Sequence, residues 1–505
     1  MFKKFAVLFT VFLLIFSFGC QFFSTKQTTN LTISTLPTII TNTNTPTTEN
    51  TENPISYDLL FNNEVMHRFV ISFSQANFDK LVDDMMNYHD QFGTYRDNTI
   101  QEVDILYEDS YGNKVELNEV GFRTKGNIYT RVLPVILDNK NQVVGYQQVS
   151  FQLEFNETFS YPDNSTQYKD LKQRRMFDLE QLNFKAIKAE DTGVVTEMVA
   201  YDLFREAGIP APNTSLAVIY FDIDGQVIPY GLYTVTEPLD DVFVRRVFGK
   251  NFDGSIGDLY KCVWQQNGPA TLEVNDTSAA VAVSDYNLGY RIAYQLKTNK
   301  LTSDFSSFSH FVTDLNTYSQ TLSYQNKLGS ILDVDTWLKT LAMSYLIGNP
   351  DDYRGNANNY YLYFYEGKAV YIPFDFDQSL GYGWNPYNNY GLTLDIHNYP
   401  SVNPSYLTAD KLVLVKNVLA FPEFQDRYEK YILEYTNPTD GIFKYSRYYD
   451  EYILAKNLYL NELTSVNHLG VREFSLTNRS MHPSKYFSDK IYYARANAEF
   501  YQDKR

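Results

Sequence analysis

The feature that most constrains the fold is a pair of apolar runs at residues 360–374 that flank a short turn. The runs YYLYFY and AVYIPF are similar in length, and the turn EGK between them contains Gly367. This pattern predicts a β-hairpin. Because paired strands lie about 5 Å apart, the residues before the first strand and those after the second must meet.

Acidic and amide side chains occur in both of the stretches that meet at the open end of the hairpin. The stretch NPDDYRGNANN precedes the hairpin at residues 349–359, and DFDQSLG follows it at 375–381. The hairpin is expected to bring together carboxylates and amides from both stretches: Asp351 or Asp352, Asn358 or Asn359, Asp375 and Asp377.

These side chains suggest a site for a hard cation. If the chain is extended at Asp375 and Asp377, both carboxylates project to one face, because strand side chains alternate. Carboxylate and amide oxygens without His or Cys suit Mg²⁺, Mn²⁺ or Ca²⁺. The 6 His are scattered, and the 2 Cys, Cys20 and Cys262, provide neither a disulfide framework nor a multi-Cys zinc site.

Composition excludes some partners. The formal charge is -17, and no long basic run follows the first four residues. A nucleic acid or an anionic lipid surface recognised by basic side chains is therefore disfavoured. The 505 residues are 44% hydrophobic, which is enough for one large core or two lobes.

The N-terminus has the pattern of an export signal. Residues 1–20 combine Lys3 and Lys4, an apolar run and a terminal SFGC that resembles a bacterial lipobox, with Ser17 where that pattern usually has Leu. We expect a lipid anchor on Cys20 and an extracytoplasmic protein on the outer face of a bacterial membrane. An uncleaved anchor and plain secretion are the alternatives. Residues 21–56 are rich in Thr and Asn, which predicts a disordered tether.

Two regions of different class follow. Residues 57–242 contain alternating apolar strands and a prominent helix at 192–208, so we expect a β-rich part. Residues 243–505 show mainly helical periodicity, as in 333–349. The junction of two such lobes is a favourable place for a ligand cleft. The predicted strands are 65–73, 100–107, 115–127, 147–155, 179–187 and a pair within 214–237; further helices are 74–89, 409–420, 422–437 and 446–463.

Two segments carry a family resemblance. GNPDDYRGNANNYYLY followed by YIPFDFDQSLG resembles the signature of the spore coat protein H (CotH) family, which are atypical secreted protein kinases. Shorter segments stand in the order that this family shows: GFRTKGN, VSFQLEF, LNFKA, AYDLFREAGIPAP, YGLYTVTE and GDLYK. The resemblance covers roughly residues 60 to 400.

The resemblance implies a two-lobed α+β fold of the protein-kinase type, ATP, and Mg²⁺ or Mn²⁺. It makes Asp352 the base that accepts the proton of a protein Ser or Thr hydroxyl, and Asn359 a metal ligand. Asp375 would correspond to the metal-binding Asp of kinases, and Asp377 would hold a second ion. In such enzymes, positioning and neutralisation of phosphate charge supply most of the catalysis.

The resemblance also assigns cations to the nucleotide. Lys185 would pair with Glu197 and contact phosphates, with Lys188 as the alternative. Arg123 and Lys125 would form a turn, flanked by Gly121 and Gly126, that covers phosphates. Glu237 would stand near the base, and Lys261 is a further candidate.

The sequence also departs from the family pattern. Gln147 and Gln148 replace paired basic residues, and the region of Thr196 lacks an Arg that the family often has. These departures keep open a second hypothesis, a non-catalytic (pseudokinase) surface binding or adhesion lipoprotein.

Overall fold

The computed structural model describes residues 55–128, 130–264, 269–274, 281–283, 292–383, 390–398, 400–405 and 407–505. The predicted signal peptide lies outside the described residues, as does the predicted tether up to residue 54. Ser56 already belongs to the folded part, because its side chain caps helix α2 (Tyr57–Leu60). Among the described residues, no helix combines the length and the apolar character needed to span a bilayer.

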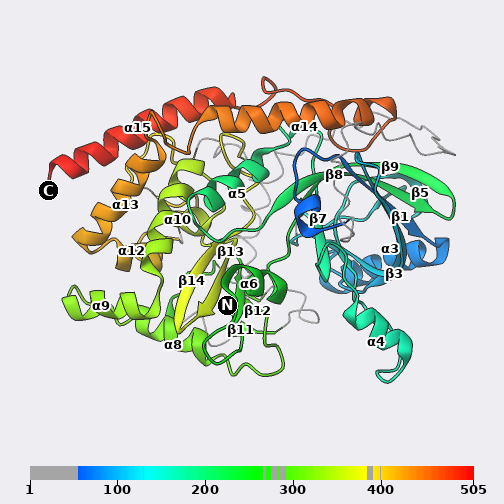
Figure 1. Cartoon of the computed structure of the whole chain (residues 1–505), viewed down its shortest axis with the longest axis horizontal. Helices are drawn as coiled ribbons and strands as arrows, with labels where there is room; N and C mark the ends of the chain where they lie inside the picture. Colours follow the sequence, from blue (N-terminus) through cyan, green and yellow to red (C-terminus); the bar gives the residue numbers. More distant parts are fainter. Residues whose placement is uncertain are drawn as a thin grey trace, which may run out of the picture.

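The first half of the chain forms a closed barrel (Figure 1). Neighbouring strands are antiparallel except for β1 (His67–Phe73) and β8 (Thr214–Ile223), which pair in parallel and close the barrel. The strands, in barrel order, are β1 (His67–Phe73), β2 (Gln101–Asp109), β3 (Lys114–Lys125), β6 (Ser150–Glu154), β7 (Gln181–Ala186), β9 (Gln226–Thr236) and β8 (Thr214–Ile223).

Aromatic side chains pack together in the barrel core. Phe151 stacks on Phe184 with ring centroids 4.6 Å apart and on Phe122 at 5.0 Å. Because successive side chains of a strand point to opposite faces, Phe122, Phe151 and Phe184 all point from their strands into the barrel. Helix α3 (Gln75–Phe92) contacts β1 and β2 and begins at the predicted cap, Ser74, which accepts a hydrogen bond from Asn77 N at 3.2 Å.

The second half contains a sheet that the sequence interpretation missed. Its order is β11 (Val281–Ala282), β12 (Tyr294–Leu296), β10 (Leu259–Cys262), β13 (Tyr360–Tyr365) and β14 (Lys368–Pro373). The prediction that this half is mainly helical recognised only the last two strands. The other three strands are two to four residues long, which is too short for an alternating pattern. They are stabilised by pairing with neighbouring strands of the sheet.

Helices cover the second sheet and join it to the barrel. Helix α10 (Val334–Ile347) is buried along most of its length and contacts β14, α5 (Thr196–Glu206), α13 (Pro422–Tyr435) and α15 (Pro483–Asp503). The predicted mixed α+β class is confirmed. The remaining helices and strands are β4 (Val135–Leu137), β5 (Val143–Tyr146), α4 (Thr166–Gln173), α6 (Asp241–Phe248), α8 (Ser306–Leu315), α9 (Leu322–Ile331), α11 (Tyr353–Asn356), α12 (Val413–Val418) and α14 (Tyr445–Ser465).

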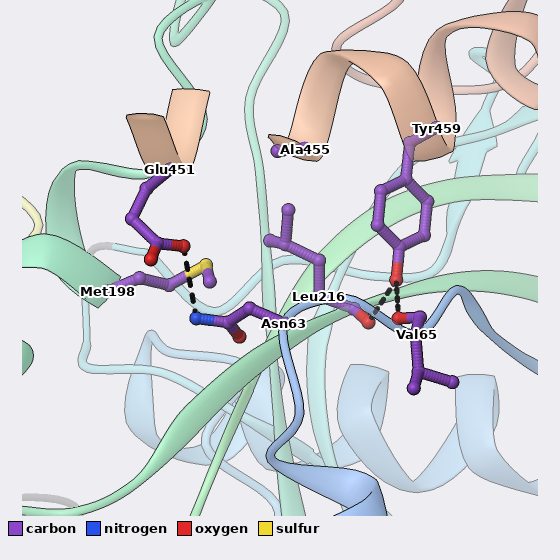
Figure 2. A pocket seen from close by; sticks show the side chains of 7 residues that line it. All are labelled: Asn63, Val65, Met198, Leu216, Glu451, Ala455 and Tyr459. Carbon is purple, nitrogen blue, oxygen red and sulfur yellow. Dashed lines mark hydrogen bonds between the residues drawn. The ribbon is translucent and has the colours of Figure 1, made fainter. Parts of the chain in front are cut away.

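Helix α14 runs back from the helical part to the barrel (Figure 1). Tyr459 donates a hydrogen bond to Leu216 O of β8 at 2.6 Å, and Glu462 accepts one from the buried Arg68 of β1 at 2.6 Å. Figure 2 shows the part of this joint around Tyr459, where residues of α14, α5 and β8, together with Asn63 and Val65, line a cavity of about 10 Å³. A space of this size holds at most one water, so this cavity is not a substrate site.

Candidate functional site

The hairpin formed by β13 and β14 has the expected geometry at its open end. Tyr360 pairs with Pro373, so the loop before β13 lies beside the segment after β14. The turn contains two residues, Glu366 and Gly367, with φ of 50° and 77°. This is shorter than the predicted three-residue turn. Positive φ at both positions matches the right-handed twist of the strands.

Asn349 fastens the loop to the segment after β14. Its side-chain nitrogen donates to Asp375 O at 3.1 Å, and its side-chain oxygen accepts from Asp351 N at 2.9 Å. Asn349 is fully buried. The sequence interpretation passed over this residue, because its place after a helix-ending Gly348 resembles an ordinary loop.

The two neighbouring acids of the loop have different surroundings. Asp351 accepts hydrogen bonds from the side-chain amides of Asn356 at 2.7 Å, Asn358 at 3.1 Å and Asn359 at 2.8 Å. Its carboxylate therefore organises the loop. Burial raises the pKa of Asp351 to about 6 against the opposing effect of these amides.

Asp352 caps helix α11. It accepts a hydrogen bond from Gly355 N at 2.7 Å and is only 4% exposed. Burial raises the pKa of Asp352 to about 7, although the backbone of Gly355 and the charge of Arg354 oppose the shift. A carboxylate with a pKa near neutrality is suited to proton transfer.

Lys185 lies at the centre of the candidate site. Its ammonium is 3.2 Å from Glu197 Oε1 and 3.1 Å from Asp377 Oδ2. It also contacts Asp375 Oδ1. Three predicted acids from α5 and from the end of β14 thus meet at one predicted cation from β7.

The charges of this cluster do not balance if every acid is ionised. Burial alone would lower the pKa of Lys185, but the negative charges of Asp375, Asp377 and Glu197 outweigh burial and raise it well above its usual value. Burial raises the pKa of Glu197 to about 7, with Asp377 and Asp375 adding to the shift and Lys185 opposing it. The cluster therefore attracts further positive charge.

The segment that carries the two aspartates is packed against α5. Phe376 is fully buried, with its ring centroid 4.8 Å from that of Phe204. Asp375 N donates to the hydroxyl of Tyr201 at 2.8 Å. Asp375 has φ of 63°, so the chain there does not meet the condition of an extended backbone under which both carboxylates would project to one face. Both aspartates still reach Lys185, and Tyr201 was not distinguishable from a core tyrosine in the sequence.

The predicted phosphate-covering residues lie on a strand. Arg123 and Lys125 belong to β3, as the predicted strand at 115–127 has it, and the turn that the resemblance implied for them is wrong. Only Gly126 after them has a positive φ, 133°. Arg123 pairs with Glu154 at 2.9 Å, and Lys125 donates to Asn183 at 2.5 Å.

A group of cations surrounds Lys125. Burial and then the positive charges of Arg123, Lys261 and Lys297 lower the pKa of Lys125 well below its usual value. The ammonium of Lys261 lies 4.6 Å from the ring centroid of Phe374, the residue before Asp375. A cationic region therefore borders the acidic cluster.

Two other candidates lie apart from the cluster. Lys188 is exposed. Glu237 is fully buried and forms hydrogen bonds with Arg246 at 2.9 and 2.6 Å and with Asn213 N at 3.1 Å. The structure thus gives the Glu237 carboxylate protein partners, and it does not bring this side chain to Lys185.

The donor chemistry of the cluster fits Mg²⁺ or Mn²⁺. Within the described residues, no group of three or more His, Cys, Asp and Glu is arranged to hold a metal ion. Mg²⁺, however, is usually bound by one or two carboxylates together with substrate phosphates. Asp375 and Asp377 meet that smaller requirement, and they already accommodate the positive charge of Lys185.

Comparison with known proteins gives one family. The model of the family described as CotH kinase protein matches residues 124–462, well over half of the chain. A search of curated proteins found no match. The matched range includes Lys185, Glu197, Asp352, Asp375 and Asp377.

Proposed function

Because the chain belongs to the CotH kinase protein family, we propose that it is a protein kinase. It transfers the γ-phosphoryl group of ATP to Ser or Thr hydroxyls of proteins, using Mg²⁺ or Mn²⁺. The observation that carries this proposal is the convergence of Lys185, Glu197, Asp375 and Asp377 at a single point.

We also propose a kinase-like division into two lobes, residues 57–242 and 243–505. Lys185 and Glu197 come from the first part, whereas Asp352, Asp375 and Asp377 come from the second. A ligand bound at the cluster would therefore contact both parts. This arrangement supports a site at the junction of the lobes.

The charges around the site support an ATP ligand. Lys125, Arg123 and Lys261 concentrate positive charge in a chain whose formal charge is -17. Their mutual repulsion would be relieved by a bound anion such as a triphosphate. In this proposal Lys185, oriented by Glu197, donates hydrogen bonds to phosphate oxygens.

The roles of the acids follow from their surroundings. Asp352 would accept the proton of the substrate hydroxyl, because its carboxylate has a pKa of about 7, whereas that of Asp351 is occupied by three asparagine amides. Asp375 and Asp377, with the amide oxygen of Asn359, would hold the divalent cation. When bound, that cation supplies neutralisation of the phosphate charge.

Labelled ATP tests the proposed function. We expect purified full-length protein with γ-labelled ATP and Mn²⁺ or Mg²⁺ to label Ser or Thr in itself or in a Ser-rich acceptor protein. EDTA should abolish the labelling. Asp375→Ala should lower it by about 10²-fold or more, because a preorganised charge is lost from the site. Binding of Mn²⁺ itself, measured by electron paramagnetic resonance, should weaken in the same variant.

The competing function is a non-catalytic surface binding or adhesion protein. It is favoured by one observation, the direct contact of Lys185 with the two proposed metal ligands. Nucleotide binding without any transfer by the wild type would support this alternative against the kinase. Equal transfer by the wild type and Asp375→Ala would refute the proposed role of Asp375.

We further propose that the protein is a lipoprotein anchored through Cys20 on the outer face of a bacterial membrane. The proposal is supported by the apolar run and SFGC in residues 1–20. In a bacterial host, the wild type should partition into the detergent phase and Cys20→Ser into the aqueous phase. Equal partition of both proteins would contradict a lipid anchor on Cys20.

A further inference from the structure

The connection between α14 and α15 lies beyond the residues matched by the family model. Residues 469–480 of this connection, here called the strap, form hydrogen bonds with residues in or next to each element that builds the Lys185 cluster. Val471 N donates to Ile187 O at 3.3 Å, just after β7 and two residues from Lys185. Ser480 donates to Gly381 O at 3.1 Å, four residues after Asp377.

The strap also holds the chain that leads into α5. Ser475 N donates to Thr192 O at 3.0 Å, and the Thr192 hydroxyl donates back to Ser475 O at 2.7 Å. This reciprocal pair fixes the approach to the helix that carries Glu197. One short segment therefore ties together β7, α5 and the segment after β14.

Arg479 is the strap residue that contacts the chain immediately before Glu197. Its guanidinium donates from Nη1 to the hydroxyl of Thr196 at 2.9 Å and to that of Tyr448, on α14, at 2.6 Å. Thr196 is the first residue of α5 and immediately precedes Glu197. A Cβ at Gly193 would overlap Nη1 of Arg479, so glycine there leaves room for the guanidinium.

This placement of Arg479 is costly. Its side chain is 0% exposed, and the nearest acid, Asp191, is 3.8 Å away. Within the described residues, Nε and Nη2 have no hydrogen-bond partner. A cation is also unfavourable at the N-terminus of a helix, where the helix dipole is positive. The guanidinium carbon lies 4.7 Å from the ring centroid of Tyr382 and 5.6 Å from that of Tyr448, and these cation–π contacts compensate part of the charge. Burying a charge whose compensation is incomplete destabilises a fold, which argues for a role beyond stability.

We propose that Arg479 is a positioning residue that sets the first turn of α5 and thereby the Lys185–Glu197 pair. Through the strap, the same contact couples α5 to the segment that carries Asp375 and Asp377. The effect on catalysis rests on the proposed kinase function. The structural coupling between α5 and that segment does not depend on it.

Hydrogen exchange and kinetics on the full-length protein test this role. Arg479→Met removes the donors and keeps the apolar stem. Thr196→Val removes the hydroxyl that accepts from Arg479 and that also lies 3.3 Å from the hydroxyl of Tyr448. Both should speed amide exchange in the first turn of α5 and in residues 375–381, and should lower kcat by about 10- to 100-fold, as loss of a supporting contact does. Arg472→Met, at an exposed position of the strap, is the matched control and should behave as the wild type.

A double-mutant cycle separates positioning from mere stabilisation. If Arg479 acts through Glu197, Arg479→Met should have little further effect on kcat in a Glu197→Gln background. Additive effects, or exchange equal to that of Arg472→Met, would overturn the proposal. If Arg479→Met does not fold, the exchange rates and kcat of Thr196→Val test the proposal instead. A wild type that transfers no phosphoryl group would refute the kinase, while the exchange data would still decide the coupling.

Discussion

Asp352→Asn is expected to lower kcat for phosphoryl transfer by about 10²- to 10⁴-fold, the usual contribution of a positioned acid or base. The amide cannot accept the substrate proton. It keeps the size of the side chain and an oxygen that can accept from Gly355 N, as the carboxylate does at 2.7 Å. Since Asn and Asp cap helices equally well, α11 should be retained. Steady-state kinetics with labelled ATP measures the loss.

Asp333→Asn is the control, because Asp333 also caps a helix, α10, but is not part of the candidate site. It should transfer at the wild-type rate. The pH profile gives a second check. Burial raises the pKa of Asp352 to about 7, so below that pH the base becomes protonated and kcat/KM should fall about tenfold per pH unit. A wild-type rate or an unchanged pH profile in Asp352→Asn would contradict the assignment.

Lys185→Met is expected to lower kcat/KM by about 10²- to 10³-fold, since one preorganised charge facing the phosphates is lost. It also leaves Glu197, Asp375 and Asp377 without the ammonium that they share. Lys185 opposes the raised pKa values of Glu197 and Asp377. Removing it should raise both pKa values further.

The sign of the stability change follows from these shifts. A carboxyl whose pKa is higher in the folded state stabilises the fold at low pH and loses that contribution as pH rises. The deficit in melting temperature of Lys185→Met should therefore be larger at pH 8 than at pH 5. Lys188→Met, three residues further along the chain at an exposed position, should match the wild type in rate and stability. A rate loss with Lys188→Met and none with Lys185→Met would show that Lys188, and not Lys185, contacts the phosphates.

Local patterns were sufficient for much of the fold. The turn between β8 and β9 forms at Asp224 and Gly225, with φ of 50° and 89°, as the Asp-Gly pair predicts. The parallel pairing of β1 with β8 could not be predicted, because it joins strands that are about 150 residues apart and leaves no local signal. The short strands β10 and β12 were missed because 4 and 3 residues are too few to show an alternating pattern.

The candidate site shows the same division. The sequence placed acids and amides at both ends of the hairpin, and the hydrogen bond between Asn349 and Asp375 O joins those ends. It did not reveal that Tyr201 would hold Asp375 N, because a helical tyrosine normally indicates core packing. Nor did it connect Arg479 with Thr196, 283 positions earlier in the chain.

The sequence by itself determined the hairpin and the oxygen-rich stretches at its ends, since alternation and turn chemistry act over a few neighbouring residues. Only the tertiary structure decided which cation those oxygens face. Lys185 meets Asp375 across 190 positions of the chain, after the barrel has closed and α5 has been fixed against the strap. Contacts of that range depend on the packing of the whole fold, and no spacing in the sequence specifies them.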